Sequence, residues 1–471
     1  MKMTKIKFGT DGWRAIIAKE FTVDNVARVT SGATEWLKQN FDNPSVVIGH
    51  DCRFAGELFA ETTAKVFANA GIKVYLAKGP VSTPMVSLGT LEQKSALGIV
   101  ITASHNSPSY NGYKLKGSFG GPLLPKEIQE VEDLIPDTNS VDVNGLELED
   151  FITNNLVEYV DLETMYVNHV EANFDMDAIR NSDMCFAYDA MYGSGQDVMR
   201  RLLPDIDFLH CDHNPSFNGT SPEPIHRNCG EFSEMIKMSE GQINCGLATD
   251  GDADRIGLYD SNGEFIDSHH IVLLLIKYLV EEKKLGGKVI ISFSLSPKVK
   301  KMCEHYNLDY EVVKIGFKHI AEIMLDEDVL LGGEESGGIA IKTHIPERDG
   351  IWMGLTLWEF MVKSGKSLEE LIDEVYEIVG PFKFERIDMH LKEEAKLAIV
   401  AKCENAEYKS FSDLEVRSIE DVDGYKYFFD KEEWVMIRAS GTEPVLRTYA
   451  ESATTEGAFE ILKKVHAEFK K

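Results

Sequence analysis

Three segments of this 471-residue chain follow one pattern, in which a short apolar run leads through a polar loop into a helix-like stretch. The apolar runs cover residues 45–51, 184–189 and 288–293, so the pattern returns after about 100–140 residues, the size of a small domain. Strand, loop and helix in this order are typical of α/β domains, in which loops and helix N-termini gather at one edge of a sheet. We therefore expect three related α/β domains whose loops point toward a shared centre.

The C-terminal part of the chain has a different order of strand-like and helix-like segments. Strand-like apolar runs at residues 425–429, 434–437 and 446–450 precede a helix-like stretch at 456–469, which predicts a smaller α+β domain. A chain of this length also exceeds a single ordinary core, so we divide it into four domains. Their predicted boundaries are 1–148, 149–263, 264–380 and 381–471.

Composition excludes several classes of protein. A formal net charge of −29 argues against a nucleic-acid partner, because phosphate backbones need a basic face. No apolar stretch reaches the roughly 20 residues of a membrane span, and the apolar segment 271–280, interrupted by Lys277 and Tyr278, is expected in a core. The residues after Met1 lack the apolar region of a signal peptide. We expect a cytoplasmic protein, monomeric or weakly homodimeric, without a membrane partner.

The cysteines agree with this expectation. The seven of them are scattered and never form a C-x-x-C pair, as expected in a reducing compartment without a disulfide framework or a zinc site. Each is expected to be a small buried side chain.

A serine and a histidine stand together where reactive groups are common. Ser104 and His105 follow the apolar run 97–101 and lie in a loop rich in Ser, Pro, Asn and Gly that leads to Lys114. Strand ends and loops carry chemistry more often than the interiors of elements. Taken alone, the pair is also compatible with an ordinary loop contact, and its meaning depends on the other motifs.

Three aspartates alternate in a second loop. If that loop bends, Asp250, Asp252 and Asp254 can turn their oxygens toward one hard cation, and oxygen-only ligands suit magnesium. A calcium EF-hand is excluded, because the sixth position needs glycine and is Arg255, and the twelfth needs glutamate and is Ser261. Arg255 would suit a phosphate that bridges a metal and a guanidinium. The alternative is a solvated acidic turn.

A third motif offers hydrogen bonds to a sugar. Residues 332–338 read Gly-Gly-Glu-Glu-Ser-Gly-Gly, and the side chains of Glu334, Glu335 and Ser336 can bind vicinal hydroxyls. The glycines allow the backbone to come close to a ligand. The alternative is a tight turn between two strands.

A fourth motif suits a tetrahedral dianion. Arg438 and the nearby Arg447 supply guanidinium groups, while Ser440, Gly441 and Thr442 supply hydroxyls and accessible backbone N–H groups. The alternative is a set of capping hydroxyls at the start of a helix.

Together these motifs resemble those of one family, the α-D-phosphohexomutases, which include phosphoglucomutases and phosphomannomutases. That family carries a T-A-S-H-N-P serine loop, a D-G-D-x-D-R metal loop, a G-E-x-S-G sugar loop and an R-x-S-G-T-E-P phosphate loop. All four occur here in this order, at residues 102–106, 250–255, 333–337 and 438–444. Residues 8–14 also resemble the N-terminal segment of the family, so the likeness spans nearly the whole chain.

The serine loop departs from the family pattern at one position. Ser107 stands where the family usually has proline, and Pro108 comes next. Because proline mainly stiffens a loop, we expect a change in loop mobility and no loss of chemistry.

The resemblance implies both a fold and an activity. The implied fold is α/β, with three similar mixed α/β domains and a smaller α+β C-terminal domain around a central cleft. The implied activity is that of a phosphohexomutase, an isomerase that moves a phosphoryl group between two hydroxyls of a hexose through a phosphoserine at Ser104 and a bisphosphorylated sugar. Magnesium is the implied metal, with glucose 1,6-bisphosphate as activator and intermediate and a hexose phosphate as substrate.

The same resemblance assigns roles to individual residues. Asp250, Asp252 and Asp254 would hold the metal together with an oxygen on Ser104. Charge stabilisation and proton transfer are assigned to His105, Lys114, Arg14 and Arg255. Substrate binding is assigned to Glu334, Ser336, Lys318, Arg438, Ser440, Gly441, Thr442 and Arg447. Whether His105 or Lys114 is the general base stays open, since a lysine needs a lowered pKa for that role.

The sugar is specified less tightly than the chemistry. Residues 334–336 and 316–318 resemble the corresponding segments of glucose-type members, whereas mannose-tolerant members often have histidine at the positions of Gly338 and Phe317. Glucosamine-type members have a serine loop that residues 110–114 do not match well. Glucose phosphate is therefore the predicted substrate, and a mannose or dual-specificity mutase is the alternative. A metal-dependent phosphatase and a non-catalytic sugar-phosphate-binding protein are the remaining alternatives.

Overall fold

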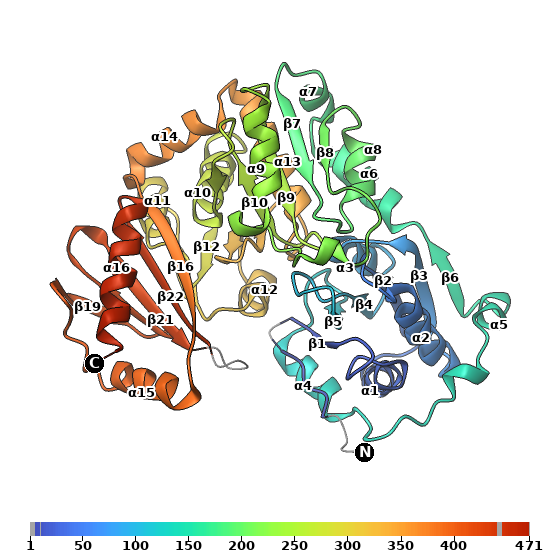
Figure 1. The fold of residues 1–471 in the computed structure, drawn as a ribbon. Coiled ribbons are helices and arrows are strands. Elements are labelled where there is room, and N and C mark those ends of the chain that lie inside the picture. Colours follow the sequence, from blue (N-terminus) through green and yellow to red (C-terminus); the bar gives the residue numbers. More distant parts are fainter. Residues whose placement is uncertain (1–4, 10, 440–444, 471) are drawn as a thin grey trace. The chain divides into compact units, whose positions relative to one another are not determined.

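The computed structural model describes residues 5–9, 11–439 and 445–470 (Figure 1). The chain forms two compact units. The first contains Met1–Ile290 and Gly316–Ile372, and the second contains Ile291–Ile315 and Asp373–Lys471. The chain passes between the two units three times, within strand β12, directly before helix α12 and within helix α14. Each unit is described below by itself.

The first sheet has six strands in the order β1-β5-β4-β2-β3-β6. Strands β4, β2, β3 and β6 pair in parallel, whereas β5 pairs antiparallel with both β4 and β1. The strands are β1 (Trp13–Ile16), β2 (Ser45–His50), β3 (Lys73–Pro80), β4 (Leu97–Ile101), β5 (Tyr110–Gly117) and β6 (Val157–Val160). The helices of this region are α1 (Val23–Asn40), α2 (Gly56–Asn69), α3 (Thr83–Glu92), α4 (Pro125–Asp133) and α5 (Leu148–Thr153), with a 3-10 turn η1 (Val143–Gly145). All five residues of β4 are buried, as expected for a parallel strand covered by helices on both faces.

The second sheet has five strands in the order β11-β10-β9-β7-β8. Strand β7 pairs in parallel with β8 and β9, and β9 and β10 form an antiparallel hairpin. The strands are β7 (Cys185–Asp189), β8 (Asp207–Leu209), β9 (Ile243–Thr249), β10 (Ile256–Tyr259) and β11 (Phe265–Ile266). The helices are α6 (Leu162–Asn173), α7 (Met176–Arg180), α8 (Gln196–Leu202) and α9 (Gly230–Met238), with 3-10 turns η2 (Phe217–Gly219) and η3 (His226–Asn228).

A third group of elements completes the first unit. Its strands are β12 (Lys288–Ser292), β14 (Val329–Gly333) and β15 (Ile339–Ile341), and its helices are α10 (Ser268–Glu281), α12 (Phe317–Asp326), α13 (Gly350–Ser364) and α14 (Leu368–Val379). Strands β14 and β15 form an antiparallel hairpin. Helix α13 begins at Asp349, whose carboxylate caps the helix by accepting a hydrogen bond from the backbone of Trp352. Helix α10 is buried from Ser268 to Leu279, so the apolar segment predicted at 271–280 is a core helix.

The second unit is built on an antiparallel sheet in the order β16-β22-β21-β20-β19. Its elements are α11 (Lys298–Tyr306), β13 (Tyr310–Val313), β16 (Lys383–His390), α15 (Glu393–Glu404), β17 (Ser410–Phe411), β18 (Leu414–Glu415), β19 (Ser418–Glu420), β20 (Tyr425–Phe428), η4 (Asp430–Glu432), β21 (Trp434–Ala439), β22 (Val445–Ser452) and α16 (Thr455–Glu468). Buried side chains of this sheet, such as Tyr427 and Leu446, pack with Ile461 of α16 into one core.

The structure confirms the strands and helices that were predicted in the three repeated units and in the C-terminal part. The three strand–loop–helix units correspond to β2 with α2, β7 with α8 and β12 with α11, and the predicted C-terminal runs correspond to β20, β21, β22 and α16. Six cysteines are buried as predicted, but Cys185 is exposed, and the expectation for it was wrong. Cys185 is the first residue of β7 and lies at the exposed end of the strand, whereas the four residues that follow are buried. Over the described residues, no helix is both long and apolar enough to cross a membrane. The domain boundaries given above stay predictions.

Candidate active site

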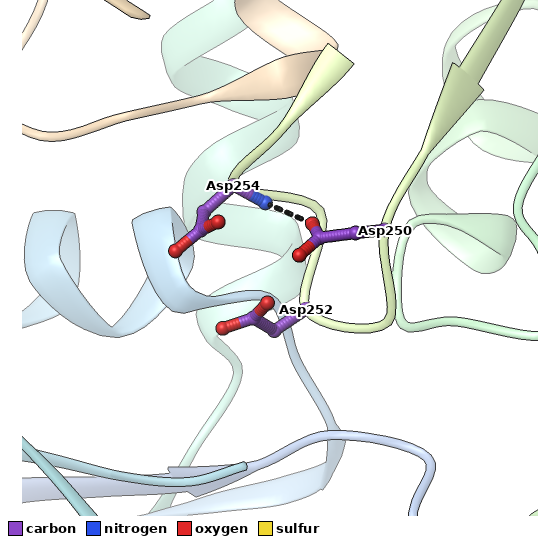
Figure 2. A group of neighbouring side chains, drawn as sticks. All are labelled: Asp250, Asp252 and Asp254. Atoms are coloured by element: carbon purple, nitrogen blue, oxygen red, sulfur yellow. Dashed lines mark hydrogen bonds between the residues drawn. The ribbon is translucent and has the colours of Figure 1, made fainter. Parts of the chain in front are cut away.

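The alternating aspartates lie in the tight loop that joins β9 to β10. The carboxylates of Asp250, Asp252 and Asp254 are fully buried, and each offers one oxygen within 4.8 Å of the oxygens of the other two. Figure 2 shows the three side chains turned toward a common space. The loop closes at Ala253, which has a left-handed φ of 55°. The predicted convergence of the three carboxylates is therefore present.

Backbone hydrogen bonds fix the shape of this loop. One oxygen of Asp250 accepts hydrogen bonds from the backbone N–H groups of Asp254 at 2.9 Å and Arg255 at 3.1 Å, the first of which is drawn in Figure 2. The neighbouring regions contribute as well. The N–H of Thr83 donates to the carbonyl of Asp252, the N–H of Gly350 donates to that of Ala253, and Ile256 donates to the carbonyl of Gly337 in the sugar loop. The aspartates are thus placed by all three α/β regions.

The free oxygens of the loop fit a divalent cation. Lys114 binds the Oδ2 atoms of Asp252 and Asp254, while their Oδ1 atoms are buried and have no hydrogen-bond partner within the described part of the chain. Burial, followed by repulsion from Asp252 and Asp254, raises the pKa of Asp250 well above its usual range. Crowded buried carboxylates that keep oxygens without donors are expected to bind a cation, and an all-oxygen set suits magnesium.

Ser104 approaches this loop from the first sheet. It follows β4, is 1 % exposed and has a left-handed φ of 52°. Its hydroxyl donates a 2.7 Å hydrogen bond to Oδ2 of Asp250, and Nδ1 of His105 lies 3.4 Å from the same Oγ atom. The serine–histidine pair and the aspartate loop, predicted separately from the sequence, therefore form one site.

Lys114 is placed by a strand and not by the loop that we expected. The loop after β4 ends before Tyr110, because residues 110–117 pair with β4 and β1 as strand β5. The ammonium group of Lys114 contacts Asp11 at 2.7 Å, Asp252 at 2.7 Å and Asp254 at 2.8 Å. Burial alone would lower the pKa of Lys114, but these three carboxylates outweigh it and raise the pKa. The side chain of Lys114 is therefore protonated and positively charged at neutral pH.

The other predicted cations of the first unit surround the same centre. Arg14 of β1 donates a 2.8 Å hydrogen bond to Oδ1 of Asn106 in the serine loop. Arg255 is buried, and its Nε lies 4.0 Å from carboxylate oxygens of Asp250 and Asp254. Burial, together with Arg255 and Arg14, lowers the pKa of His105 well below its usual value, so its imidazole is neutral at neutral pH.

Two charged residues of the site were missed from the sequence. Arg348 binds Oδ2 of Asp254 at 2.6 Å and also contacts Asp11. Burial opposes the ionisation of Asp11, but Lys114 and Arg348 outweigh it and hold its pKa well below its usual range. Both lie in segments with a visible signal, since Asp11 falls within the N-terminal segment 8–14 and Arg348 within a charged run after β15.

The sugar loop joins β14 to β15. Glu334 is buried, accepts a 3.0 Å hydrogen bond from the N–H of Gly316, and has a carboxylate oxygen 3.8 Å from Arg348. Ser336 is half-buried in the same turn, and Lys318 is half-buried in the first turn of α12. The hydrogen bond between Ile256 and Gly337 joins this loop to the metal loop. Glu334 is thus connected to the site, while the ligand roles of Ser336 and Lys318 stay predictions.

The predicted phosphate-binding arginines lie in the second unit. Arg438 of β21 and Arg447 of β22 are directly opposite each other in the antiparallel pairing. Arg438 lies 3.3 Å from Asp423, and Arg447 lies 3.9 Å from Asp388. Two like charges at opposed positions repel, so the pair is favourable when an anion lies between them. Ser440, Gly441 and Thr442 lie outside the described residues.

Comparison with known proteins identifies the family. Four family models match, described as phosphoglucomutase/phosphomannomutase alpha/beta/alpha domain I at residues 5–142, domain II at 164–263, domain III at 267–379 and the C-terminal domain at 389–468. The chain belongs to the phosphoglucomutase/phosphomannomutase family. The predicted fold class, three α/β domains and a smaller C-terminal one, is confirmed, and the protein is a mutase of the isomerase class.

Relatives of the chain match along nearly their whole length. A phosphoglucomutase/phosphomannomutase of Thermococcus kodakarensis is 29% identical over 97% of this chain and 96% of its own. A probable phosphoglucosamine mutase of Methanosphaera stadtmanae is 28% identical over 97% and 96%. The crystal structure of a putative phosphomannomutase from Thermus thermophilus is 30% identical, with a TM-score of 0.87 over 100% of both chains. Relatives of similar identity thus carry the names of mutases for different sugars.

Proposed function

We propose that this phosphohexomutase interconverts glucose 1-phosphate and glucose 6-phosphate through a phosphoserine at Ser104 and a bisphosphorylated sugar. The observation that carries the proposal is the position of Ser104 Oγ, 2.7 Å from Asp250 at the edge of a buried cluster of carboxylates and cations. A hydroxyl in this place is next to the charges that a transferring phosphoryl group requires. The aspartates Asp250, Asp252 and Asp254 would hold magnesium, which supplies positive charge against the phosphoryl oxygens when bound.

The reaction requires two opposite transfers. In the first, the bond between phosphorus and Oγ of Ser104 breaks, a bond from phosphorus to a free sugar hydroxyl forms, and the hydroxyl proton is passed on so that Oγ regains one. In the second, Oγ attacks the other phosphate of the bisphosphorylated sugar and loses its proton, which the departing sugar oxygen gains. Phosphoserine is restored, no water is consumed, and the net change is the position of one phosphoryl group.

We propose different roles for the two candidate bases. Nδ1 of His105 lies 3.4 Å from Oγ of Ser104, so we assign proton transfer to His105. An ammonium group has three donors, and those of Lys114 face Asp11, Asp252 and Asp254. We assign Lys114 to placing charge beside the transferring group, with Arg14 and Arg255.

Binding of the substrate is assigned to the two remaining motifs. The carboxylate of Glu334, with Ser336 and Lys318, would bind sugar hydroxyls. The guanidinium groups of Arg438 and Arg447, with Ser440, Gly441 and Thr442, would hold the phosphate that is not being transferred. A separate phosphate site lets the bisphosphorylated sugar bind in either direction, and it favours retention of the phosphoryl group over its loss to water.

The sugar is proposed from the binding motif, and other hexoses are the alternatives. The Glu-Glu-Ser sequence at 334–336 supports glucose phosphate as the substrate. The second candidate is mannose phosphate, either alone or together with glucose phosphate. An axial and an equatorial hydroxyl differ by one hydrogen bond, about 1–3 kcal/mol if it is left unpaired. Because phosphoglucosamine mutases are as similar to the chain as the phosphoglucomutase relative, glucosamine phosphate belongs in the same test.

The test is a coupled assay with magnesium and catalytic glucose 1,6-bisphosphate. The purified protein is given glucose 1-phosphate, mannose 1-phosphate or glucosamine 1-phosphate, and both the 6-phosphate product and free phosphate are measured. We expect product from glucose 1-phosphate without release of phosphate, and loss of activity in Ser104→Ala. The matched control is Ser107→Ala, which removes a hydroxyl of the same loop that bonds only to Ser109 among the described residues. Full activity of Ser104→Ala would exclude the mechanism, and stoichiometric phosphate release would indicate a phosphatase.

A further inference from the structure

The loop that carries Ser104 is held by one buried arginine that has no place in the motifs discussed above. Arg53 follows β2, and its side chain is 0% exposed. Its Nη2 donates hydrogen bonds of 2.6 Å to the carbonyl oxygens of Ser104 and Asn106, and its Nη1 donates to those of Ser107 at 2.9 Å and Tyr110 at 3.1 Å. A single guanidinium group therefore binds four carbonyls between the end of β4 and the start of β5.

We propose that Arg53 is a positioning residue for phosphoryl transfer, which holds Ser104 in its left-handed conformation with Oγ directed at Asp250. This inference rests on the proposed function of Ser104. Arg53 does not contact Oγ itself in the structure, so its effect on the reaction is exerted through the backbone of the loop.

Both peptide groups that flank the Cα of Ser104 are tied to the same carboxylate. On one side, the N–H of Ser104 donates a 2.8 Å hydrogen bond to Oγ1 of Thr102, whose hydroxyl donates to Oδ2 of Asp51. On the other side, the carbonyl of Ser104 is bound by Arg53, whose Nε lies 3.2 Å from Oδ2 of Asp51. Rotation about either backbone bond of Ser104 would break one of these contacts.

These contacts stabilise an unfavourable backbone conformation of Ser104. A φ of 52° is unfavourable for a residue with a Cβ atom, and such conformations persist where the surroundings determine them. In an extended conformation the side chain of Ser104 would point in another direction. The four hydrogen bonds from Arg53 also direct the carbonyl oxygens of the loop toward a positive charge, which keeps their lone pairs away from a phosphoryl group on Oγ.

Arg53 also supplies rigidity where the loop lacks its usual proline. Ser107 occupies that position, and its carbonyl is one of the four that Arg53 binds. The ring of Phe217, from the turn η2 beside the second sheet, lies 4.9 Å from the guanidinium carbon. The guanidinium group of Arg53 therefore also contacts a residue beside the second sheet.

The decisive variant is Arg53→Lys, which keeps the charge and most of the side chain but cannot reach four carbonyls with one ammonium group. Arg28→Lys is the matched control. Arg28 is a buried arginine of the same domain, donates to the carbonyl of Pro136 at 2.8 Å and to Asn25, and has no contact with the serine loop among the described residues. We would measure kcat, KM, melting temperature, and the single-turnover rate of transfer from phosphorylated enzyme to substrate.

For Arg53→Lys we expect kcat and the single-turnover rate to fall by about 100-fold, as for a reacting group displaced by about 1 Å, with KM changed less than about threefold. Arg28→Lys should lower the melting temperature without changing either rate. Wild-type kcat in Arg53→Lys would overturn the proposal. If Arg53→Lys does not fold, Arg53→Gln is measured instead, because its amide offers two donors for the four carbonyls, and wild-type kcat in that variant would equally overturn the proposal.

Hydrogen exchange of residues 102–110 tests how Arg53 holds the serine loop, and this measurement does not require an activity assay. Exchange in this segment should be at least about tenfold faster in Arg53→Lys than in Arg28→Lys, because the loop loses native hydrogen bonds. Equal exchange in the two variants would overturn the positioning role. If the wild type has no mutase activity but the two variants differ in exchange as expected, the proposed function would be contradicted. The role of Arg53 in holding the serine loop would still stand.

Discussion

The hydroxyl of Ser104 donates a 2.7 Å hydrogen bond to Oδ2 of Asp250, although 146 residues separate the two in sequence. The contact joins the loop after β4 of the first sheet to the loop after β9 of the second. Packing is close as well, because a Cβ at Gly251 would lie 2.7 Å from the carbonyl oxygen of Ser104. The proposed nucleophile and the proposed metal site are therefore parts of one rigid arrangement.

Replacement of Asp250 by asparagine should separate catalysis from stability. Although Lys114 binds Asp252 and Asp254, both carboxylates repel Asp250 when no metal ion is bound, so Asp250→Asn should raise the melting temperature in EDTA. The variant should also lose most of the gain in melting temperature that magnesium gives the wild type, and its kcat should fall by about 100-fold or more. The control is Asp260→Asn, another buried aspartate in the turn after β10. A full magnesium-dependent gain in Asp250→Asn would show that the metal binds elsewhere.

Removal of the buried lysine should be costly for the fold. Lys114→Met leaves Asp11, Asp252 and Asp254 without their shared cation, and loss of one partner of a buried ion pair costs about 3–5 kcal/mol. The free energy of unfolding, measured with urea, should fall by this amount. Lys73→Met is the control, because the pair of Lys73 with Glu158 is partly exposed and should contribute less than about 1 kcal/mol. Equal losses in the two variants would contradict the central role of Lys114.

Local patterns in the sequence predicted most of the secondary structure and those parts of the site that lie within one segment of the chain. The apolar runs predicted as strands are β2, β7 and β12, and the aspartates that alternate in sequence converge because a short hairpin loop places them so. These are short-range properties, set by periodicity and by residue type.

Contacts between distant segments could not be predicted in this way. Arg348 binds Asp11 across 337 residues, and Arg53 binds the carbonyl of Ser104, which is 51 residues away in the sequence. Although Arg348 lies in a charged run, the sequence does not give the partners of either arginine, because these contacts depend on which sheets and loops pack together. The loop after residues 97–101 was expected to lead as far as Lys114 because it is rich in Ser, Pro, Asn and Gly, yet pairing with both β4 and β1 makes residues 110–117 a strand.

The space beside Gly338 is filled by Arg348. A Cβ built at Gly338 would lie 2.4 Å from Cδ of Arg348, so Gly338→Ala must push the arginine away from Asp254 and Glu334. We expect a loss of about 1–3 kcal/mol in the free energy of unfolding, as in other overpacked interiors, and a lower kcat. The control is Gly286→Ala, where a Cβ would meet no atom of the described residues within 4 Å. Wild-type stability and activity in Gly338→Ala would show that Arg348 moves without consequence.

A buried acid in the second unit should make stability depend on pH. Glu451 of β22 is 1% exposed, and burial raises its pKa to about 7, against the opposing effects of Ser296, Lys298 and Lys426. Lys426 lies over the rings of Phe293 and Trp434, and burial lowers its pKa to about 8 although Glu451 opposes the shift. Both groups thus resist ionisation in the same core.

The sign of the effect follows from the raised pKa of Glu451. The folded state holds a proton on Glu451 up to about pH 7, whereas the unfolded state loses it near 4.5, the ordinary pKa of a glutamate side chain. The stabilisation present below pH 4.5 is therefore lost as the pH rises through 7. Glu451→Gln resembles the protonated acid, and we expect it to match the wild type at pH 5 and to be more stable by about 2–3 kcal/mol at pH 8. Thermal and urea unfolding at the two pH values measure the difference, with the exposed Glu456→Gln as control. A gain in Glu451→Gln that is the same at both pH values, or a loss at pH 8, would contradict a protonated Glu451 in the folded protein.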